Sequence, residues 1–157
     1  MTINEELTHE LLAFFNGFSS WENSIVRSSE LTVSEAHALE VLGEHDKINM
    51  KGLAQRLGVT TGTTTVTVDR LEKKNFAHRE STKEDRRVNL ISLTDVGKKA
   101  FEEHHDYHLH LTEQMTVVLS DDEIKQFLHT LKKSMPKPSR KMGWIQDRGY
   151  EQHSEVV

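Results

Sequence analysis

Apolar residues in the first part of the chain recur at helical spacing. Between residues 5 and 27 they repeat every three or four positions, which predicts one long helix with a narrow apolar stripe. Such a stripe is typical of a helix that packs along another helix. A second helix is expected to begin at Thr32, because Thr32 and Glu35 have the spacing of a capping box. The stripe of the first helix consists of Leu7, Leu11, Phe14, Phe18, Trp21 and Ile25.

The middle of the chain predicts two helices followed by a pair of strands. A third, short helix is expected over residues 49–57, where Gly58 ends it, and a fourth opens at Thr60 as its N-cap. The pattern then changes, and residues 76–81 and 88–93 predict two strands. A polar loop joins these strands, so the expected element is an extended hairpin.

The last third of the chain predicts two more helices. Thr94 is placed to cap a long fifth helix that reaches about Leu119. Ser120 and Glu123 form a capping box for a sixth helix, which ends before Pro136.

This order of elements predicts the fold class. It is mainly α with a small β-hairpin wing: a winged helix-turn-helix with N- and C-terminal dimerisation helices. We expect the first dimerisation helix in residues 1–30, the DNA-binding domain in residues 31–95 and the further dimerisation helices in residues 96–135. Residues 136–157 are expected to form a flexible tail.

Composition narrows the function classes. The chain has 157 residues and no cysteine, which removes disulfides and thiolate chemistry. It contains no apolar run of membrane-spanning length and no recognisable secretion signal, so a cytoplasmic location without a membrane partner is expected. The net charge is −5, but residues 51–99 carry eleven Lys/Arg and six Asp/Glu. A basic block inside an acidic chain indicates where a polyanion would bind.

The fourth helix is the candidate reader of double-stranded DNA. Its side chains at helical spacing separate into an inward face with Thr64, Val68 and Leu71 and an outward face rich in threonine. Threonine is a poor helix former, so a run of exposed threonines favours a role other than stability. Small hydroxyl and methyl groups suit base edges, whereas arginine and lysine suit phosphates and the minor groove. The predicted DNA contacts are Thr61, Gly62, Thr65, Val66, Arg70 and Lys74 on the helix and Lys83, Arg86 and Arg87 on the hairpin tip.

Four short segments carry a resemblance to a known family. They read LAQRLGVT over residues 53–60, VDRLEKK over 68–74, DRR over 85–87 and LTDVG over 93–97. In this order and spacing they resemble the MarR (multiple antibiotic resistance regulator) family over about residues 5–135.

The resemblance implies a function and an assembly. Family members are homodimers whose first, fifth and sixth helices form the interface, and they usually repress genes from pseudo-palindromic operators. It further implies that Asp85 braces the wing arginines and that Arg86 or Arg87 enters the minor groove. Two features depart from the family pattern: Asn75 stands where glycine often ends the recognition helix, and the tail after Pro136 is long.

Histidines are concentrated in the fifth helix. Of ten in the chain, four lie between residues 104 and 110, and His104 and His108 are spaced to share one helix face. The resemblance brings the helices of Glu22 and His37 to the same place, which makes Glu22, His37, His104 and His108 a candidate Zn²⁺ site. In these histidines the chain is similar to zinc-responsive, AdcR-type members of the family. In its recognition helix it is similar to lipid-responsive, FabT-type members.

Other interpretations stay open from the sequence. The histidines are equally compatible with ordinary solvated or hydrogen-bonded helix positions, in which case the effector is a small aromatic or acyl ligand. A metal-dependent hydrolase is the rival enzyme class, but the chain has no H-E-x-x-H pattern and the wing would have no purpose. A protein-binding adaptor would not need the exposed threonines or the wing arginines. The leading hypothesis is therefore a non-enzymatic, dimeric DNA-binding regulator.

Overall fold

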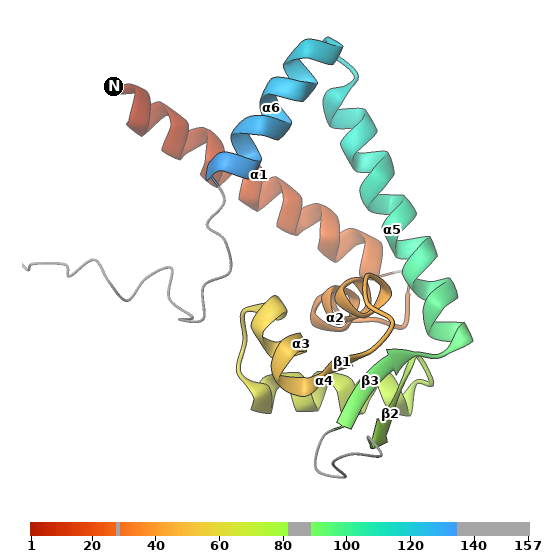
Figure 1. Cartoon of the computed structure of the whole chain (residues 1–157). Coiled ribbons are helices and arrows are strands. Elements are labelled where there is room, and N and C mark those ends of the chain that lie inside the picture. The colour runs from red at the N-terminus through yellow and green to blue at the C-terminus, as the bar shows by residue number, and fades with distance from the viewer. Residues whose placement is uncertain (28, 82–88, 135–157) are drawn as a thin grey trace, which may run out of the picture. The chain divides into compact units, whose positions relative to one another are not determined.

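The computed structural model of the chain describes residues 1–27, 29–81 and 89–134 (Figure 1). By its packing the chain divides into two units, Met1–Leu119 and Ser120–Val157. Within the described part, no helix is both long and apolar enough to cross a membrane. The elements are α1 (Ile3–Val26), α2 (Val33–Gly43), β1 (Ile48–Asn49), α3 (Met50–Leu57), α4 (Thr61–Lys73), β2 (Ala77–Ser81), β3 (Asn89–Leu93), α5 (Asp95–Thr116) and α6 (Asp121–Ser134).

Local hydrogen bonds fix where most helices begin. The predicted capping box of α2 is present, with the Thr32 backbone N–H donating to Glu35 and the Glu35 N–H donating back to the Thr32 hydroxyl. Thr60 and Thr94 cap α4 and α5 as expected. In the second unit, Ser120 forms its predicted box with Glu123.

Two left-handed residues separate the helices from the segments that follow. Gly58 has φ +68° and ends α3, as predicted. Asn75, two residues after the end of α4, has φ +62°. A left-handed residue usually is glycine, and asparagine is one of the few others that adopts this backbone readily. Asn75 therefore takes the conformational role that glycine has in the family pattern.

The wing is the larger part of a three-stranded antiparallel sheet. The strand order is β1-β3-β2, with Ala77 opposite Leu93 and Ile48 opposite Ile91. The predicted strands match β2 and β3 to within one residue at each end. β1 was not predicted; it has only two residues and exists through its pairing with β3.

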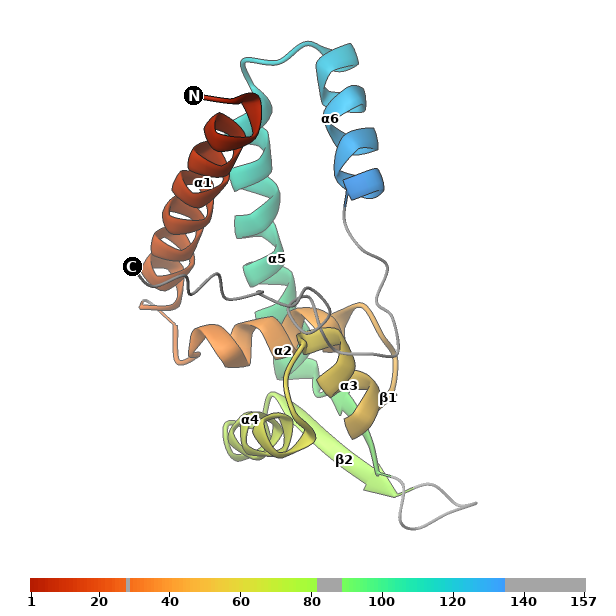
Figure 2. The same ribbon diagram turned by 90° about the vertical axis from the view of Figure 1, so that its left-hand side faces the viewer.

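A single apolar core holds α2, α3, α4 and the sheet together. Figure 2 shows α4 beside β2 and below α2. The inward face expected for α4 is confirmed: Thr64, Val68 and Leu71 are fully buried, as is Leu53 of α3. Thr67 was not assigned inward but is also buried, and its hydroxyl donates to the Thr63 carbonyl, which satisfies it there.

The apolar stripe of α1 stays largely exposed in the single chain. Leu7, Leu11 and Phe14 are between 45% and 55% exposed. On α6, considered by itself, Phe127, Leu128 and Leu131 are between 42% and 50% exposed. Helices this apolar on one side normally bury that side against another surface.

Candidate nucleic-acid interface and metal centre

The outward face of α4 presents small and polar groups to solvent. Thr61, Gly62 and Arg70 are exposed, Thr65 is half-buried and Val66 is 50% exposed. These five residues are the DNA contacts predicted within α4, and all of them lie on or beside one exposed face of the helix. A helix with such short side chains can approach base edges closely in a major groove.

Hydroxyl groups along α4 bond to the helix itself. Thr65 donates to the Thr61 carbonyl at 2.8 Å, and Thr64 donates to the Thr60 carbonyl at 2.9 Å. In this arrangement the Thr65 hydroxyl oxygen can still accept a hydrogen bond, and its methyl group remains available to a thymine methyl. The threonines therefore offer acceptors and methyl groups more readily than donors.

An arginine at the root of the wing holds the recognition helix against the sheet. Arg79 on β2 pairs with Asp69 of α4, and its Nε lies 3.3 Å from the Glu72 carboxylate. Glu72 also accepts the Arg79 backbone N–H at 2.9 Å, and the Thr65 carbonyl accepts from the guanidinium at 3.4 Å. Sequence reasoning missed Arg79, because nothing local in its pattern shows that it crosses from strand to helix.

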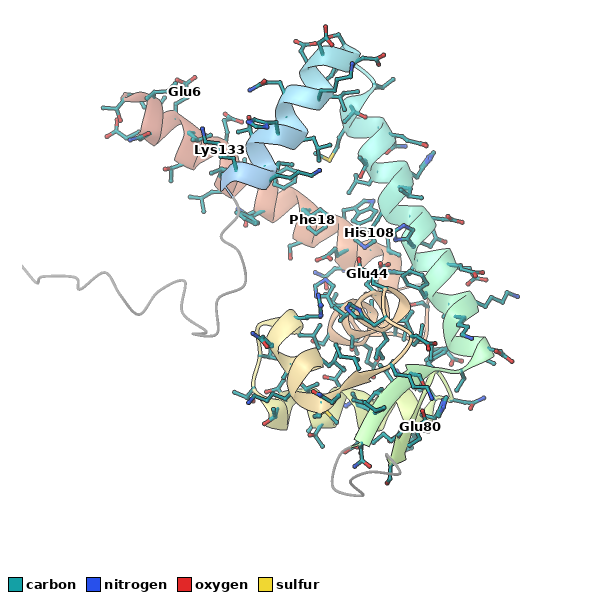
Figure 3. All side chains as sticks on the ribbon, viewed as in Figure 1. Glu6, Phe18, Glu44, Glu80, His108 and Lys133 are labelled. Carbon is teal, nitrogen blue, oxygen red and sulfur yellow. The ribbon has the colours of Figure 1, made fainter. Side chains whose placement is uncertain are left out.

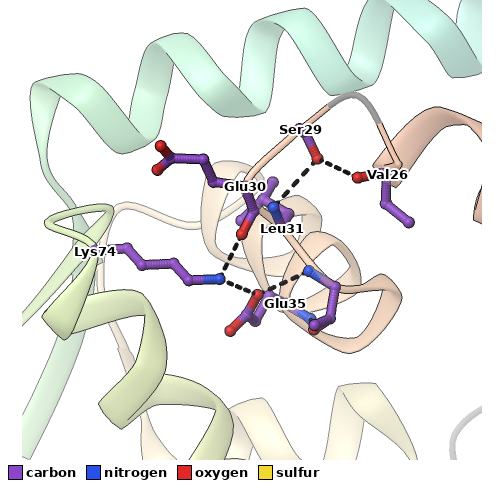
Figure 4. A network of polar contacts seen from close by, with 7 residues as sticks. Val26, Ser29, Glu30, Leu31, Glu35 and Lys74 are labelled. Carbon is purple, nitrogen blue, oxygen red and sulfur yellow. Dashed lines mark hydrogen bonds and ion pairs between the residues drawn. The ribbon is translucent and has the colours of Figure 1, made fainter.

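Lys74, which is predicted to contact phosphate, pairs with a buried carboxylate in this structure. Its ammonium lies 2.7 Å from Oε2 of Glu35 and also donates to the Glu30 carbonyl (Figure 4). The Glu35 side chain is only 1% exposed. Burial by itself would raise the pKa of Glu35, but the hydrogen bonds from Lys74 and Thr32 and the charge of Lys74 together hold that pKa below its usual 4.5. In this structure Lys74 therefore links the end of α4 to the start of α2, and its predicted phosphate contact stays a prediction.

The wing tip carries the remaining DNA predictions. Lys83, Asp85, Arg86 and Arg87 lie outside the described residues, so their contacts stay predictions. The two strands that flank the tip, β2 and β3, pair antiparallel from Ala77 opposite Leu93 to Ser81 opposite Asn89.

The predicted metal ligands form two pairs at the junction of α1, α2 and α5. His37 Nε2 and Glu22 Oε1 are 2.6 Å apart, and Glu22 is 7% exposed. His104 Nε2 and His108 Nε2 are 3.1 Å apart on α5. Both pairs come from the expected elements, but among the described residues these four do not make one cluster with all ligand atoms within 4.8 Å.

Glu40 joins the histidine pair instead. One oxygen or nitrogen from each of Glu40, His104 and His108 lies within 4.8 Å of the others. Glu40 stands three residues after His37, so both lie on one side of α2. That spacing was a signal available in the sequence, but a lone glutamate on a helix gives no reason to select it.

The surroundings of the histidine pair are apolar on one side and charged on the other. Figure 3 shows Phe18 of α1 and His108 of α5 near each other, with ring centres 6.0 Å apart, and Trp21 meets the same histidine at 5.1 Å. His104 is 6% exposed. Burial lowers its pKa below the usual 6.5, and the charges of His108 and His37 lower the pKa further against the opposing charge of Glu22. A lowered pKa favours the neutral imidazole form of His104, which is the form that binds metal ions.

The fold and the exposed face of α4 define a class of protein. Two helices joined by a tight turn, a third helix packed across them and a β-hairpin form a winged helix-turn-helix, which is a DNA-binding architecture. Residues 31–88 match the model of the MarR family. The winged helix-turn-helix of this chain is therefore similar to that of the MarR family.

Similar proteins agree with this assignment. The HTH-type transcriptional repressor MdtR of Bacillus subtilis is 37% identical over 73 residues, which are 46% of this chain and 47% of MdtR. The HTH-type regulator YfiV of the same organism is 32% identical over 72 residues, 46% of this chain and 45% of YfiV. The chain thus matches about half the length of these relatives. The structure of Streptococcus pneumoniae FabT in complex with DNA aligns with a TM-score of 0.76 at 26% identity, over 83% of this chain and 93% of FabT.

Proposed function

We propose that this chain is a DNA-binding transcription regulator, acting as a repressor, that places α4 in the major groove of a pseudo-palindromic operator. The exposed, threonine-rich face of α4 carries the proposal, because it lies where a winged helix-turn-helix presents its recognition helix. Similarity to a protein solved with DNA and to a named repressor supports it. The relatives named above are transcription regulators, which argues against the hydrolase alternative.

The regulator acts as a homodimer in this proposal. The exposed apolar stripe of α1 and the apolar side of α6 need a partner surface, and a second copy supplies one that matches. Two recognition helices then address half-sites about one helical turn, or about 34 Å, apart. Sedimentation should show a dimer, and a monomer that binds a palindrome tightly would contradict this assembly.

Binding to DNA is tested by fluorescence anisotropy over a salt series. An operator selected from random DNA should bind at least about 10³-fold more tightly than bulk DNA. Arg86→Ala and Arg87→Ala should each weaken binding to both DNAs and lower the slope of log affinity against log salt by about 1. Thr65→Ala should instead reduce discrimination by about 1–3 kcal/mol. Equal losses on operator and bulk DNA for Thr65→Ala would remove its role as a sequence reader.

The effector in this proposal is a divalent metal, of which Zn²⁺ is the candidate. Support comes from the histidines and carboxylates that α1, α2 and α5 bring to the junction between α1 and the winged helix. The donor set of imidazole nitrogen and carboxylate oxygen suits Zn²⁺. A metal at this junction changes DNA affinity only if it binds two arrangements differently, by a coupling of typically about 1–3 kcal/mol.

The matching experiment measures operator affinity with Zn²⁺ and with a chelator. In the double variant His104→Ala/His108→Ala the metal response should disappear while circular dichroism and dimerisation stay unchanged. An unchanged metal response in that variant contradicts the metal proposal.

A small aromatic or acyl effector is the second candidate. A surface pocket of about 470 Å³ lies between the end of α2, the sheet and α5, and it is lined by His45, His78, Ser92 and Phe101 among others. Its size and mixed lining suit a small aromatic acid. Salicylate that weakens operator binding of the chelated protein would favour this candidate.

A further inference from the structure

We propose that α4 selects thymine in its operator through methyl contacts, and that Gly62, Thr65 and Val66 determine this base preference. The preference depends on the DNA-binding function proposed above and adds the base chemistry that the recognition helix reads. It follows from an outward face without nitrogen donors, from two side chains that present methyl groups there, and from a glycine that the fold does not require.

The outward face of α4 lacks the side chains that recognise guanine. Guanine presents two acceptors in the major groove, O6 and N7, and proteins bind them mainly with arginine or lysine. Residues 60–69 contain no arginine, lysine, asparagine, glutamine or histidine, and Arg70 is the first side chain of α4 with a nitrogen donor. Hydroxyl protons do not replace these donors, because Thr64, Thr65 and Thr67 donate to carbonyls of the preceding turn. The first turns of the helix therefore offer methyl groups and acceptor oxygens.

Thr65 and Val66 supply methyl groups on this face. Val66 is 50% exposed, whereas Val68, two residues later, is fully buried in the core. The Thr65 hydroxyl donates to the Thr61 carbonyl at 2.8 Å, so its proton is already used. Valine and threonine are poor helix formers, and their place on the surface of α4 does not serve helix stability. In the major groove, the C5-methyl group of thymine is the base group that apolar contacts of this kind select.

Gly62 lies one turn before Val66 and allows this face to come close to DNA. Beyond adjacent residues and the helix backbone, a Cβ at Gly62 would have one neighbour within 4 Å, the Thr60 hydroxyl oxygen at 3.8 Å. Gly62 is helical and has no positive φ, so neither packing nor conformation requires glycine there. Glycine in a helix lowers stability relative to alanine. The missing side chain therefore serves a contact outside the chain, and a Cβ would hold the methyl groups away from the bases.

Uracil scanning of the selected operator tests the thymine contacts. Uracil pairs as thymine does but lacks the methyl group, so each thymine is replaced in turn and affinity is measured by fluorescence anisotropy. At least one thymine in each half-site should show a loss of about fourfold, as expected for one buried methyl group. In Val66→Ala that loss should disappear at the thymine that Val66 contacts. Val96→Ala is the matched control, because Val96 is a 51% exposed valine on α5, and it should retain the loss.

Two substitutions of Thr65 separate its methyl group from its hydroxyl group. Thr65→Ser keeps the hydroxyl group and removes the methyl group, whereas Thr65→Val keeps the methyl group and removes the hydroxyl group. The preference for thymine over uracil at the base that Thr65 contacts should vanish in Thr65→Ser and persist in Thr65→Val. The reverse order would assign Thr65 to a hydrogen bond with a base and overturn its methyl contact.

Gly62→Ala separates a contact with DNA from a structural role. Operator binding should weaken at least about fivefold, the effect of one methyl group too many at a close-packed contact, while the urea midpoint equals or exceeds that of the parent. A glycine that the fold requires behaves differently: a Cβ at Gly97 would lie 1.8 Å from the Phe76 carbonyl oxygen, so Gly97→Ala should lose stability. Unchanged operator affinity in Gly62→Ala, or an operator in which uracil costs nothing, overturns the inference and leaves the DNA-binding regulator standing. If the unaltered chain prefers no operator over bulk DNA, the inference and the proposed function fail together.

Discussion

Replacing Lys74 by methionine tests whether this residue anchors the fold or contacts DNA. The Lys74 ammonium is the cation paired with Glu35, whose side chain is 1% exposed. Methionine keeps the length and apolar stem of lysine but removes the charge. The Glu35 carboxylate then remains buried without its ionic partner, although it still accepts the Thr32 N–H.

The expected loss of stability follows from that burial. Removing one partner of a fully buried ion pair costs about 3–5 kcal/mol. The Lys74 side chain is 30% exposed, so solvent reduces the strength of this pair, and we expect about 2–3 kcal/mol. For a chain of this size that corresponds to a fall in melting temperature of roughly 4–12 °C.

The pH dependence gives the sign of the effect. In the folded protein the pKa of Glu35 is below its usual 4.5, so the stability from this group is fully present above pH 4.5 and is lost as pH falls through the lower, folded value. In Lys74→Met the lowering contributions of lysine are absent, and burial raises the pKa of Glu35. The difference in unfolding free energy between the two proteins should therefore shrink as pH falls from 7 to 4.

Urea unfolding at several pH values measures these differences. The control Lys74→Met/Glu35→Gln removes both charges while the glutamine oxygen can still accept from Thr32, so its stability should return to within about 1 kcal/mol of the parent. A pure phosphate contact predicts the opposite pattern: unchanged stability and a DNA salt slope lower by about 0.9. That outcome, or a stability deficit that does not vary with pH, would refute the anchor.

Three further substitutions test the structure around the recognition helix. Gly97→Ala should lower the free energy of unfolding by at least about 2 kcal/mol, because a Cβ there would lie 1.8 Å from the backbone carbonyl oxygen of Phe76; an unchanged urea midpoint would contradict this packing. Asn75→Gly should raise stability by about 0.5 kcal/mol and Asn75→Ala should lower it by about 1 kcal/mol, since φ is +62° there; stabilisation by alanine in the same urea assay would exclude that conformation. Arg79→Met and Asp69→Ala should show a coupling of about 0.5–1 kcal/mol in a double-mutant cycle, and strictly additive losses would mean that the pair does not hold α4 to the wing.

Helix boundaries were determined by the sequence because their causes are local. Thr32 and Glu35 satisfy each other's backbone N–H groups within three residues, and no distant part of the chain is needed. Gly58 ends α3 through its own backbone freedom. The inward face of α4 followed from helical periodicity for Val68 and Leu71 in the same way.

Pairings between distant residues were decided only by the tertiary structure. β1 depends on β3, and its residue Ile48 lies 43 positions from its partner Ile91. Lys74 was predicted to meet phosphate because a lysine near the end of a recognition helix commonly does, whereas the packing of α4 against α2 brings it to Glu35. Apolar residues reveal a buried face by their regular spacing, but a single charged residue shows no such pattern, so the sequence does not identify its partner.

The candidate metal centre also combines features that the sequence predicted with features that only the tertiary structure revealed. The spacing of His104 and His108 places both rings on one face of α5, and that geometry follows from the helix alone. Glu22 was the carboxylate predicted from the sequence, and nothing in spacing or composition pointed to Glu40. Packing separates them, because it hydrogen-bonds Glu22 to His37 and leaves one buried oxygen of Glu40 facing the histidine pair. Burial and hydrogen-bond satisfaction are properties of the folded chain, so the sequence supplies the candidate donors and only the tertiary structure shows which of them lie close together.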